Sequence, residues 1–339
     1  MIEIDGGYLE GGGQIIRTAI ALASVTGQTV HIFNIRKGRD KPGLRPQHLE
    51  GISAALSICD GKAEGLSLKS TEVSFTPGRI RGGKYEIDTK TAGSVTLILQ
   101  TLVPIGMHAD GSVELTVKGG TAVPFSPTIA YFQYIHCGLL RMLGISVDIE
   151  VRRHGFYPRG GGEIHAKIYP AEIKGLDLTE RGELLEIQVD AVASFHLKSA
   201  RVAERMISGF KNIIPESRAE CKYVPTISPG CFVNSCACYE KSLVGSDALG
   251  RVGKRAEDVG KDAAFALRKV IEKDIPIDVY MVDQIIPYMA LAVHETGKSS
   301  RIRIPELTKH AETNTWVVEQ FLPVRFDVEN SVMICRKTK

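Results

Sequence analysis

The chain has 339 residues, of which 43% are hydrophobic and 24% charged, and its net charge is +3 at pH 7. This composition is typical of a folded protein of about two domains; it argues against extensive disorder, and it requires any basic binding site to be local. No apolar run reaches the roughly 18 residues of a transmembrane helix. The first residues, MIEIDGG, carry acids where a secretory signal carries basic residues, so we expect a cytoplasmic protein with no membrane partner.

One unit recurs along the chain. It consists of small residues, an apolar helix, a glycine-containing turn and a strand. It occurs at residues 11–35, 92–117 and 126–151, with a looser copy at 283–304. A further helix is expected at 48–61, followed by strand-like segments as far as residue 87. The pattern predicts about three βαβαββ repeats and therefore an α+β fold, in which helices cover the sheets.

The repeated unit is missing between residues 183 and 276. That segment instead predicts a strand in LLEIQVDAV, a basic helix in KSARVAERMISGFKNI, a strand near Cys231 and a long helix in AEDVGKDAAFALRKVIEK. We therefore predict a large catalytic repeat domain over residues 1–182 and 277–339. A smaller α/β domain is expected to be inserted into it at 183–276.

The chain has seven cysteines, an odd number that favours reduced thiols in the cytoplasm. Cys231, Cys236 and Cys238 lie close together, but their C-x4-C-x-C spacing matches no common zinc site. The run CFVNSCACY is more typical of a buried strand, in which free cysteine behaves as a small hydrophobic residue.

Residues 154–163, HGFYPRGGGE, form a predicted loop between two alternating, strand-like runs. Three consecutive glycines cost backbone entropy, so they indicate either a turn or a place where the backbone approaches another group closely.

Three polar residues surround the start of the first helix: Glu10 in the preceding glycine loop, and Gln14 and Arg17 on the helix itself. Gln14 and Arg17 lie three residues apart, on a different face from the apolar stripe. They form either a solvated helix face or a helix N-terminus directed at an anion.

The loop IRKGRDKPGLRPQH (35–48) is basic and contains almost no apolar residues. Its glycines and prolines restrict its shape, so several donors are held together in a way that suits a phosphate. The alternative is an ordinary soluble surface loop. The basic or titratable residues of this segment are Arg36, Lys37, Arg39, Lys41, Arg45 and His48.

Polar residues interrupt two apolar helices. Gln100 lies within SVTLILQTLVPI, and Asp283 and Gln284 lie within YMVDQIIPYMALA. Because a buried polar group needs a partner, these side chains either bond to a neighbouring segment or contact a ligand between the helices.

His310 precedes a helix that we expect to be capped by Thr313, Asn314 or Thr315. The positive end of that helix would favour a neutral imidazole, which can act as a nucleophile or a base at pH 7. An isolated loop histidine is also compatible with no special role.

Together these stretches resemble the RNA 3′-terminal phosphate cyclase family. HGFYPRGGGEI matches the family's signature of a His or Arg, Gly, two residues, Pro, one residue, three glycines, one residue and an aliphatic. DGGYLEGGGQIIR, IRKGRDKPGL, TAGSVTLILQTL, YMVDQIIPYMALA and FLPVRF also match, so the likeness runs from Ile2 to Phe326 and is weakest in the inserted segment. Arg45 is offset from the bacterial pattern, and it is not assigned a role.

The resemblance implies a large domain of three βαβαββ repeats with a small inserted domain. It also implies an enzyme that uses ATP and a divalent metal, Mg²⁺ or Mn²⁺, to convert the 3′-terminal phosphate of RNA into a 2′,3′-cyclic phosphodiester. His310 would form a covalent AMP–histidine. By position, the ATP contacts would be Gln100, Tyr280, Met281, Val282, Asp283 and Gln284, and the residues around the catalytic pocket and RNA phosphate would be Glu10, Gln14, Arg17, Arg36, Arg39 and Lys41. The metal ligands and self-association into a homo-oligomer are left open.

Two alternatives share the fold. A non-catalytic cyclase-like RNA-binding factor of ribosome assembly would lack the nucleophilic histidine, so His310 argues against it. An enolpyruvyl transferase would leave the HGFYPRGGGEI signature unexplained.

Overall fold

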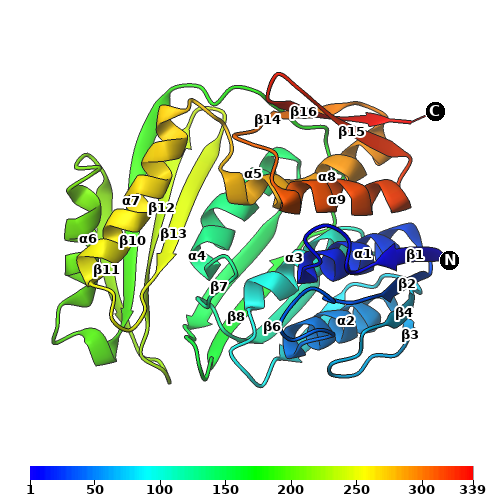
Figure 1. Ribbon diagram of the computed structural model, residues 1–339, viewed down its shortest axis with the longest axis horizontal. Helices are drawn as coiled ribbons and strands as arrows, with labels where there is room; N and C mark the ends of the chain where they lie inside the picture. Colours follow the sequence, from blue (N-terminus) through cyan, green and yellow to red (C-terminus); the bar gives the residue numbers. More distant parts are fainter. Residues whose placement is uncertain (339) are drawn as a thin grey trace.

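The structure, a computed structural model, describes residues 1–338, and within them the chain forms four mixed four-stranded sheets with helices (Figure 1). The first unit consists of β1 (Ile2–Asp5), α1 (Gly13–Thr26), β2 (Val30–Phe33), α2 (Pro46–Cys59), β3 (Lys62–Glu64) and β4 (Val73–Thr76). The second unit begins with β5 (Gly83–Asp88), α3 (Val95–Gly106) and β6 (Val113–Gly119). It continues with a helix in three parts, α4 (Ile129–Tyr131), the π-helix η1 (Phe132–His136) and α5 (Cys137–Met142), and ends with β7 (Val147–Arg153) and β8 (Gly162–Ile168).

The third unit is split by the inserted segment. It contains β9 (Asp177–Leu178), α8 (Val279–Thr296), β14 (Ser300–Arg303), α9 (Lys309–Phe321), β15 (Val324–Glu329) and β16 (Val332–Lys337). The segment between β9 and α8 contains β10 (Leu184–Ser194), the 3-10 turn η2 (Phe195–Leu197), α6 (Val202–Lys211), β11 (Arg218–Val224), β12 (Cys231–Tyr239), β13 (Leu243–Leu249) and α7 (Ala256–Glu272).

The three units have the same sheet topology. In each, the first strand pairs in parallel with the second, the second pairs antiparallel with the fourth, and the fourth pairs antiparallel with the third. The predicted α+β architecture of three βαβαββ repeats is therefore confirmed. No sequence pattern predicted β9, because a two-residue strand is too short to show alternation.

The helices of the three units pack against one another at the centre of the molecule (Figure 1). Helix α1 contacts α3 and α9, α8 contacts α9, and α2 contacts α3. A single hydrophobic cluster joins the three units, and it includes most of the buried residues of α1, α3 and α8. The N-terminal ends of α1 and α9 come together in this arrangement, although they lie almost 300 residues apart in the chain.

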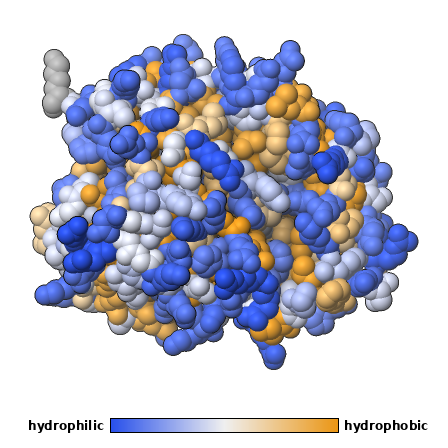
Figure 2. Space-filling model, turned by 180° about the vertical axis from the view of Figure 1, so that it is seen from behind, coloured by the Kyte–Doolittle hydropathy of each residue, from blue (hydrophilic) through white to orange (hydrophobic). Residues whose placement is uncertain are grey.

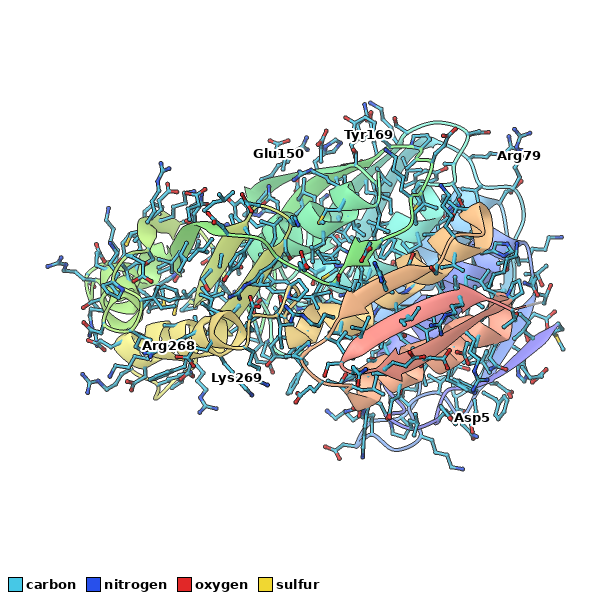
Figure 3. All side chains as sticks on the ribbon, turned by 90° about the horizontal axis from the view of Figure 1, so that it is seen from above. Asp5, Arg79, Glu150, Tyr169, Arg268 and Lys269 are labelled. Carbon is cyan, nitrogen blue, oxygen red and sulfur yellow. The ribbon has the colours of Figure 1, made fainter. Side chains whose placement is uncertain are left out.

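The inserted segment has its own sheet, in the order β11-β10-β12-β13, and its own hydrophobic cluster beneath α6 and α7. The two helices touch at glycines: a Cβ on Gly209 would lie 2.0 Å from the Glu257 carbonyl oxygen, and one on Gly260 would lie 1.9 Å from that of Met206. Arg268 and Lys269 of α7 lie on the outside of this segment, far from Asp5 and Arg79 (Figure 3). These features agree with an inserted domain, whose boundaries at 183 and 276 stay a prediction.

The glycine loop between β7 and β8 is held by close backbone packing. Gly160 and Gly161 have φ values of +68° and +74°, and a Cβ on Gly160 would lie 2.6 Å from the Thr91 carbonyl oxygen. A Cβ on Gly155 would lie 2.2 Å from the backbone nitrogen of Gly162, and one on Gly161 would lie 2.3 Å from a side-chain carbon of Ile227 in the inserted segment. The glycines therefore serve close approach of chain segments, which is one of the two uses expected from the sequence.

No helix within residues 1–338 is long and apolar enough to cross a membrane. Hydrophilic side chains cover much of the face drawn in Figure 2, with hydrophobic groups scattered among them.

Candidate active site

His310 lies in the first turn of α9, and not in a loop before it. The helix begins earlier than expected because Thr308 is its N-cap: the Thr308 hydroxyl accepts a hydrogen bond from the Ala311 N–H at 3.1 Å. The predicted caps were wrong, since Thr313 donates its hydroxyl to the Lys309 carbonyl within the helix. The His310 side chain is 50% exposed, so a ligand can reach it.

Gln14 of α1 fixes the tautomer of His310. The Gln14 amide nitrogen donates to the backbone carbonyl of His310 at 2.7 Å, which turns the Gln14 carbonyl oxygen towards the imidazole Nδ1. An amide oxygen can only accept, so Nδ1 must carry the hydrogen and Nε2 keeps its lone pair. The arrangement therefore leaves a nucleophilic nitrogen on a side chain that is half exposed.

The surroundings of His310 favour its neutral form. Burial lowers the pKa of His310, Glu10 opposes this shift, and Arg39 and Arg17 add to it. Glu10 Oε1 lies 3.7 Å from His310 Nε2 and is also paired with the Arg39 guanidinium. Arg39 Nη2 also donates to the Glu10 backbone carbonyl at 3.3 Å. The structure thus brings His310, Gln14, Glu10 and Arg39 together, as expected for a single site.

Arg17 is a partly buried cation that makes no ion pair or side-chain hydrogen bond within residues 1–338, although Asp283 lies near it. Burial lowers the pKa of Arg17 to about 10, and the nearby Asp283 opposes this shift without accepting a hydrogen bond from it. A partly buried guanidinium whose N–H groups have no hydrogen-bond acceptor in the protein is suited to bind an anion. Arg17 lines two cavities, and it is the most suitable phosphate-binding group of this region.

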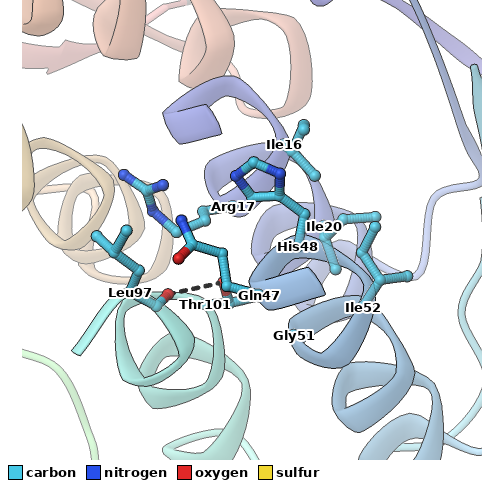
Figure 4. A pocket seen from close by; sticks show the side chains of 9 residues that line it. All are labelled: Ile16, Arg17, Ile20, Gln47, His48, Gly51, Ile52, Leu97 and Thr101. Carbon is cyan, nitrogen blue, oxygen red and sulfur yellow. Dashed lines mark hydrogen bonds between the residues drawn. The ribbon is translucent and has the colours of Figure 1, made fainter. Parts of the chain in front are cut away.

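The first cavity lies between α1, α2 and α3 (Figure 4). Its lining residues include Arg17, Gln47, His48 and Thr101. His48 is not a basic group of the loop, because burial, followed by the charges of nearby arginines, lowers its pKa to about 3. Its Nδ1 accepts a hydrogen bond from the Arg45 backbone N–H at 3.1 Å. His48 therefore completes the cap of α2 as a neutral residue.

The second cavity lies between α1, α3, α8, α9 and the end of η1. Both predicted polar interruptions reach it: the Gln100 amide donates to Gln284 Oε1 at 2.7 Å, and both side chains line the cavity. The sequence left open whether Gln100 and Gln284 bond to another segment or contact a ligand. The two side chains bond to each other and also line the cavity, so both alternatives can hold at once. The lining residues are Gln14, Arg17, Thr18, Ala21, Gln100, Pro104, His136, Asp283, Gln284, Pro287, Tyr288 and Asn314.

Asp283 is a carboxyl group at the wall of this cavity. Burial raises its pKa to about 7, and Arg17 opposes the shift. Its backbone carbonyl accepts a hydrogen bond from the Asn314 amide at 2.7 Å, and Asn314 in turn accepts one from the Thr18 hydroxyl at 2.9 Å. The backbone of α8 is thus tied to α9 and α1, which leaves the Asp283 carboxyl group available to a ligand.

Asp278 fixes the start of α8. Its carboxylate accepts hydrogen bonds from the Tyr280 and Met281 N–H groups at 3.1 Å, from the Tyr131 hydroxyl at 2.7 Å and from the Gly245 N–H at 3.2 Å. Burial raises its pKa to about 6. One side chain therefore joins α8, the second repeat and the inserted segment.

Two of the residues predicted to contact ATP have side chains that a ligand cannot reach. Met281 and Val282 are fully buried in the hydrophobic core, so only their backbone could meet a nucleotide. Tyr280 is 64% exposed. The periodicity of α8 explains the difference, because Tyr280, Asp283 and Gln284 share the face turned away from the core.

The basic loop is only partly free to bind a ligand. Arg36 was expected to contact phosphate, but its guanidinium donates to the carbonyls of Lys41 (2.6 Å) and Gly43 (3.1 Å) and so shapes the loop. Lys41 is exposed. Arg45, to which no role was assigned, lies close enough to Arg36 to lower the pKa of that guanidinium, after burial and together with Arg39. The arginines of this region repel one another and would be stabilised by an anion.

Within the part of the chain that the structure describes, no group of three or more His, Cys, Asp or Glu side chains could hold a metal ion by itself. Cys231 and Cys236 are buried in β12, the strand predicted for CFVNSCACY. Glu10 is the carboxylate next to His310. Glu10 is already paired with Arg39, and Mg²⁺ is usually held by one or two carboxylates together with substrate phosphates, so a metal beside Glu10 would need nucleotide phosphates as its remaining ligands.

The chain matches the family model "RNA 3'-terminal phosphate cyclase" over residues 8–328. It is 42% identical to an RNA 3′-terminal phosphate cyclase of Methanosarcina barkeri, with 97% of each chain covered. A protein of the same name from Methanosarcina acetivorans is 39% identical, with 97% of each chain covered. One from Pyrococcus furiosus is also 39% identical, with 98% of this chain and 96% of the relative covered. The chain therefore belongs to the RNA 3′-terminal phosphate cyclase family.

Proposed function

We propose that this protein uses ATP to convert the 3′-terminal phosphate of RNA into a 2′,3′-cyclic phosphodiester through a covalent histidine–AMP. The observation that carries the proposal is the state of His310. Gln14 accepts a hydrogen bond from Nδ1–H, burial favours the neutral ring, and the unprotonated Nε2 belongs to a half-exposed side chain near Arg39 and Arg17. A scaffolding protein would have no use for such a group, so the site supports the catalytic alternative.

In the first step His310 Nε2 attacks the α-phosphorus of ATP. An N–P bond forms, the bond from that phosphorus to the bridging oxygen breaks, and pyrophosphate leaves with the electron pair. The developing negative charge lies near Arg17 and the N-terminus of α9, both of which stabilise it.

In the second step an oxygen of the RNA 3′-phosphate attacks the same phosphorus and releases His310. The 2′-hydroxyl then attacks the terminal RNA phosphorus, loses its proton and expels AMP, which closes the cyclic diester. Adenylation is needed because a phosphate dianion is a poor electrophile with no good leaving group.

The nucleotide would be bound in the cavity lined by Gln100, Asp283 and Gln284, with Tyr280 at its exposed side. Glu10 would hold a divalent metal together with the ATP phosphates. When bound, that metal would neutralise phosphate charge. Arg39 and Lys41, on the basic loop, are the remaining candidates for contact with the RNA end.

Incubation with ATP labelled at the α-phosphate tests the proposal. We expect one acid-labile AMP per chain, and a cyclic end on an RNA that carries a 3′-phosphate. A protein that binds RNA but retains no label would favour the ribosome-assembly alternative instead.

Replacing Arg39 by alanine should separate the two half-reactions. We expect self-adenylation to change little, whereas AMP transfer to RNA should fall about ten- to hundredfold, the loss of one charge-assisted hydrogen bond of about 1.5–3 kcal/mol. RNA binding should also become less sensitive to salt. Lys37→Ala, which removes an exposed charge from the same loop, is the control. Failed self-adenylation in Arg39→Ala would instead assign Arg39 to ATP or to the positioning of Glu10.

Asp283→Asn should weaken ATP use and change the pH dependence of stability. Because the folded pKa of Asp283 is raised to about 7, its ionisation destabilises the fold as the pH rises from about 4 to 7. The variant should therefore match the wild type near pH 3.5, below the ordinary pKa of an aspartate, and melt at a higher temperature near pH 8.5. Melting curves at both pH values test this, with the exposed Glu306→Gln as control. Normal ATP dependence with a lower melting temperature would indicate a structural carboxylate.

A further inference from the structure

His136 is a buried histidine that the proposed mechanism does not use. It ends the π-helix η1, in which the Cys137 N–H donates to the Phe132 carbonyl five residues earlier. Turns of this width are rare and often occur at functional sites. The imidazole stacks on the Phe132 ring with centroids 4.2 Å apart, meets Tyr288 edge-on at 5.9 Å, and lines the cavity that contains Gln100 and Gln284.

The hydrogen bonds around Gln284 determine the tautomer of His136. The Gln284 amide nitrogen donates to the Tyr280 carbonyl at 2.6 Å, so the Gln284 oxygen must point the other way. That oxygen lies 3.1 Å from His136 Nδ1 and can only accept, so Nδ1 carries the hydrogen. Burial lowers the pKa of His136 to about 4, which keeps the ring neutral at physiological pH.

The same oxygen of Gln284 accepts a second hydrogen bond, from the Gln100 amide at 2.7 Å. Gln100 is therefore held by its nitrogen, and its own carbonyl oxygen is left for the cavity. His136, Gln284 and Gln100 thus form one chain of hydrogen bonds, in which a residue remote from His310 sets the direction of two amides that face a ligand.

We propose that His136 is a positioning residue for the nucleotide: its Nδ1–H fixes the Gln284 amide, and through it the Gln100 carbonyl, in the orientation that binds ATP. The inference rests on the proposed function, since it takes ATP as the ligand of this cavity. It goes further by assigning a role to a residue of the second repeat. The pair of Gln14 and His310 uses the same hydrogen bond, from a histidine Nδ1–H to a glutamine oxygen, but there the glutamine orients the histidine.

A second atom of His136 offers a competing role. Nε2 and the Tyr288 hydroxyl are both buried without a hydrogen-bond partner within residues 1–338, and both residues line the cavity. Nε2 could thus accept a hydrogen bond from the ligand directly. Because the two ring nitrogens lie on opposite sides of the imidazole, substitutions that mimic one nitrogen at a time distinguish the two roles.

The test compares His136→Asn, whose amide nitrogen replaces Nδ1–H, with His136→Gln, whose amide reaches the position of Nε2, and with His136→Leu. ATP affinity is measured by calorimetry, and the rate of AMP–histidine formation is measured at saturating ATP. We expect His136→Leu and His136→Gln to bind ATP about tenfold more weakly with a nearly unchanged maximal rate, and His136→Asn to stay close to the wild type. Melting temperatures identify any variant that fails to fold.

A double-mutant cycle with Gln284→Ala provides the second measurement. If His136 acts through Gln284, His136→Leu should cause no further loss of affinity in the Gln284→Ala background. Three outcomes would each overturn the proposal. They are additive losses in the double-mutant cycle, ATP affinity retained in His136→Gln but not in His136→Asn, and equal ATP affinities in all variants. A wild type that binds ATP but forms no AMP adduct would refute the proposed function alone, because ATP affinity would still report on His136.

Discussion

His310→Ala should form no covalent AMP adduct while keeping the wild-type melting temperature. The side chain is 50% exposed and lies outside the hydrophobic core, so its removal costs little packing. It carries the Nε2 on which the first step depends, and no other histidine in residues 1–338 shares its contacts with Gln14 and Glu10. Mass spectrometry after incubation with ATP should show one added AMP on the wild type and none on the variant.

His294→Ala is the matched control, because His294 is another exposed histidine, on α8. It should label like the wild type. An RNA whose 3′-phosphate has been adenylated chemically offers a second control. His310→Ala should still cyclise this RNA, since the last step uses the 2′-hydroxyl as nucleophile and needs no histidine–AMP. If the His310→Ala protein still becomes adenylated, the nucleophile is another residue.

Arg17→Met should lower both self-adenylation and AMP transfer at least about a hundredfold, because two charge-assisted hydrogen bonds of about 1.5–3 kcal/mol each would be lost from the phosphate. The melting temperature should stay the same or rise. Burial lowers the pKa of Arg17 to about 10, which means that the folded protein disfavours its charge in the absence of an anion. Methionine fills a similar volume without that charge.

Inorganic pyrophosphate provides a readout that does not depend on catalysis. It should raise the melting temperature of the wild type and not that of Arg17→Met, because a ligand that binds only the folded state stabilises it. Arg17→Lys should recover part of the effect, since it restores the charge but not the paired donors. A large drop in the melting temperature of Arg17→Met would show that the guanidinium is structural.

The two predictions distinguish chemistry from binding. His310→Ala removes the nucleophile and should still bind ATP, whereas Arg17→Met leaves the nucleophile in place and should bind phosphate poorly. A cation with no ion pair near a neutral imidazole is an arrangement that suits an anionic ligand.

Much of the fold follows from the sequence itself. Apolar residues at helical spacing predicted α1, α3 and α8, and alternation predicted β7 and β8. The cysteine-containing apolar run predicted β12 as a buried strand, and the recurrence of the helix–strand unit predicted three repeats with an insertion. These features are local: a helix or strand leaves a period in its own residues. The signature HGFYPRGGGEI indicated the family, and its glycines are explained by close backbone contacts.

The properties of the site depend on contacts between distant parts of the chain. The sequence pointed to Gln14 and His310, but the hydrogen bonds that fix the histidine tautomer join residues separated by 296 positions. His136 was missed because a histidine in an apolar helix looks the same whether it packs in the core or orients Gln284, 148 residues away. Met281 and Val282 were assigned to ATP by position, and only packing showed that they face the core. Residue types and spacing can be read from one segment, whereas tautomers, pKa values and access to a ligand are set by neighbours that only the folded chain brings together.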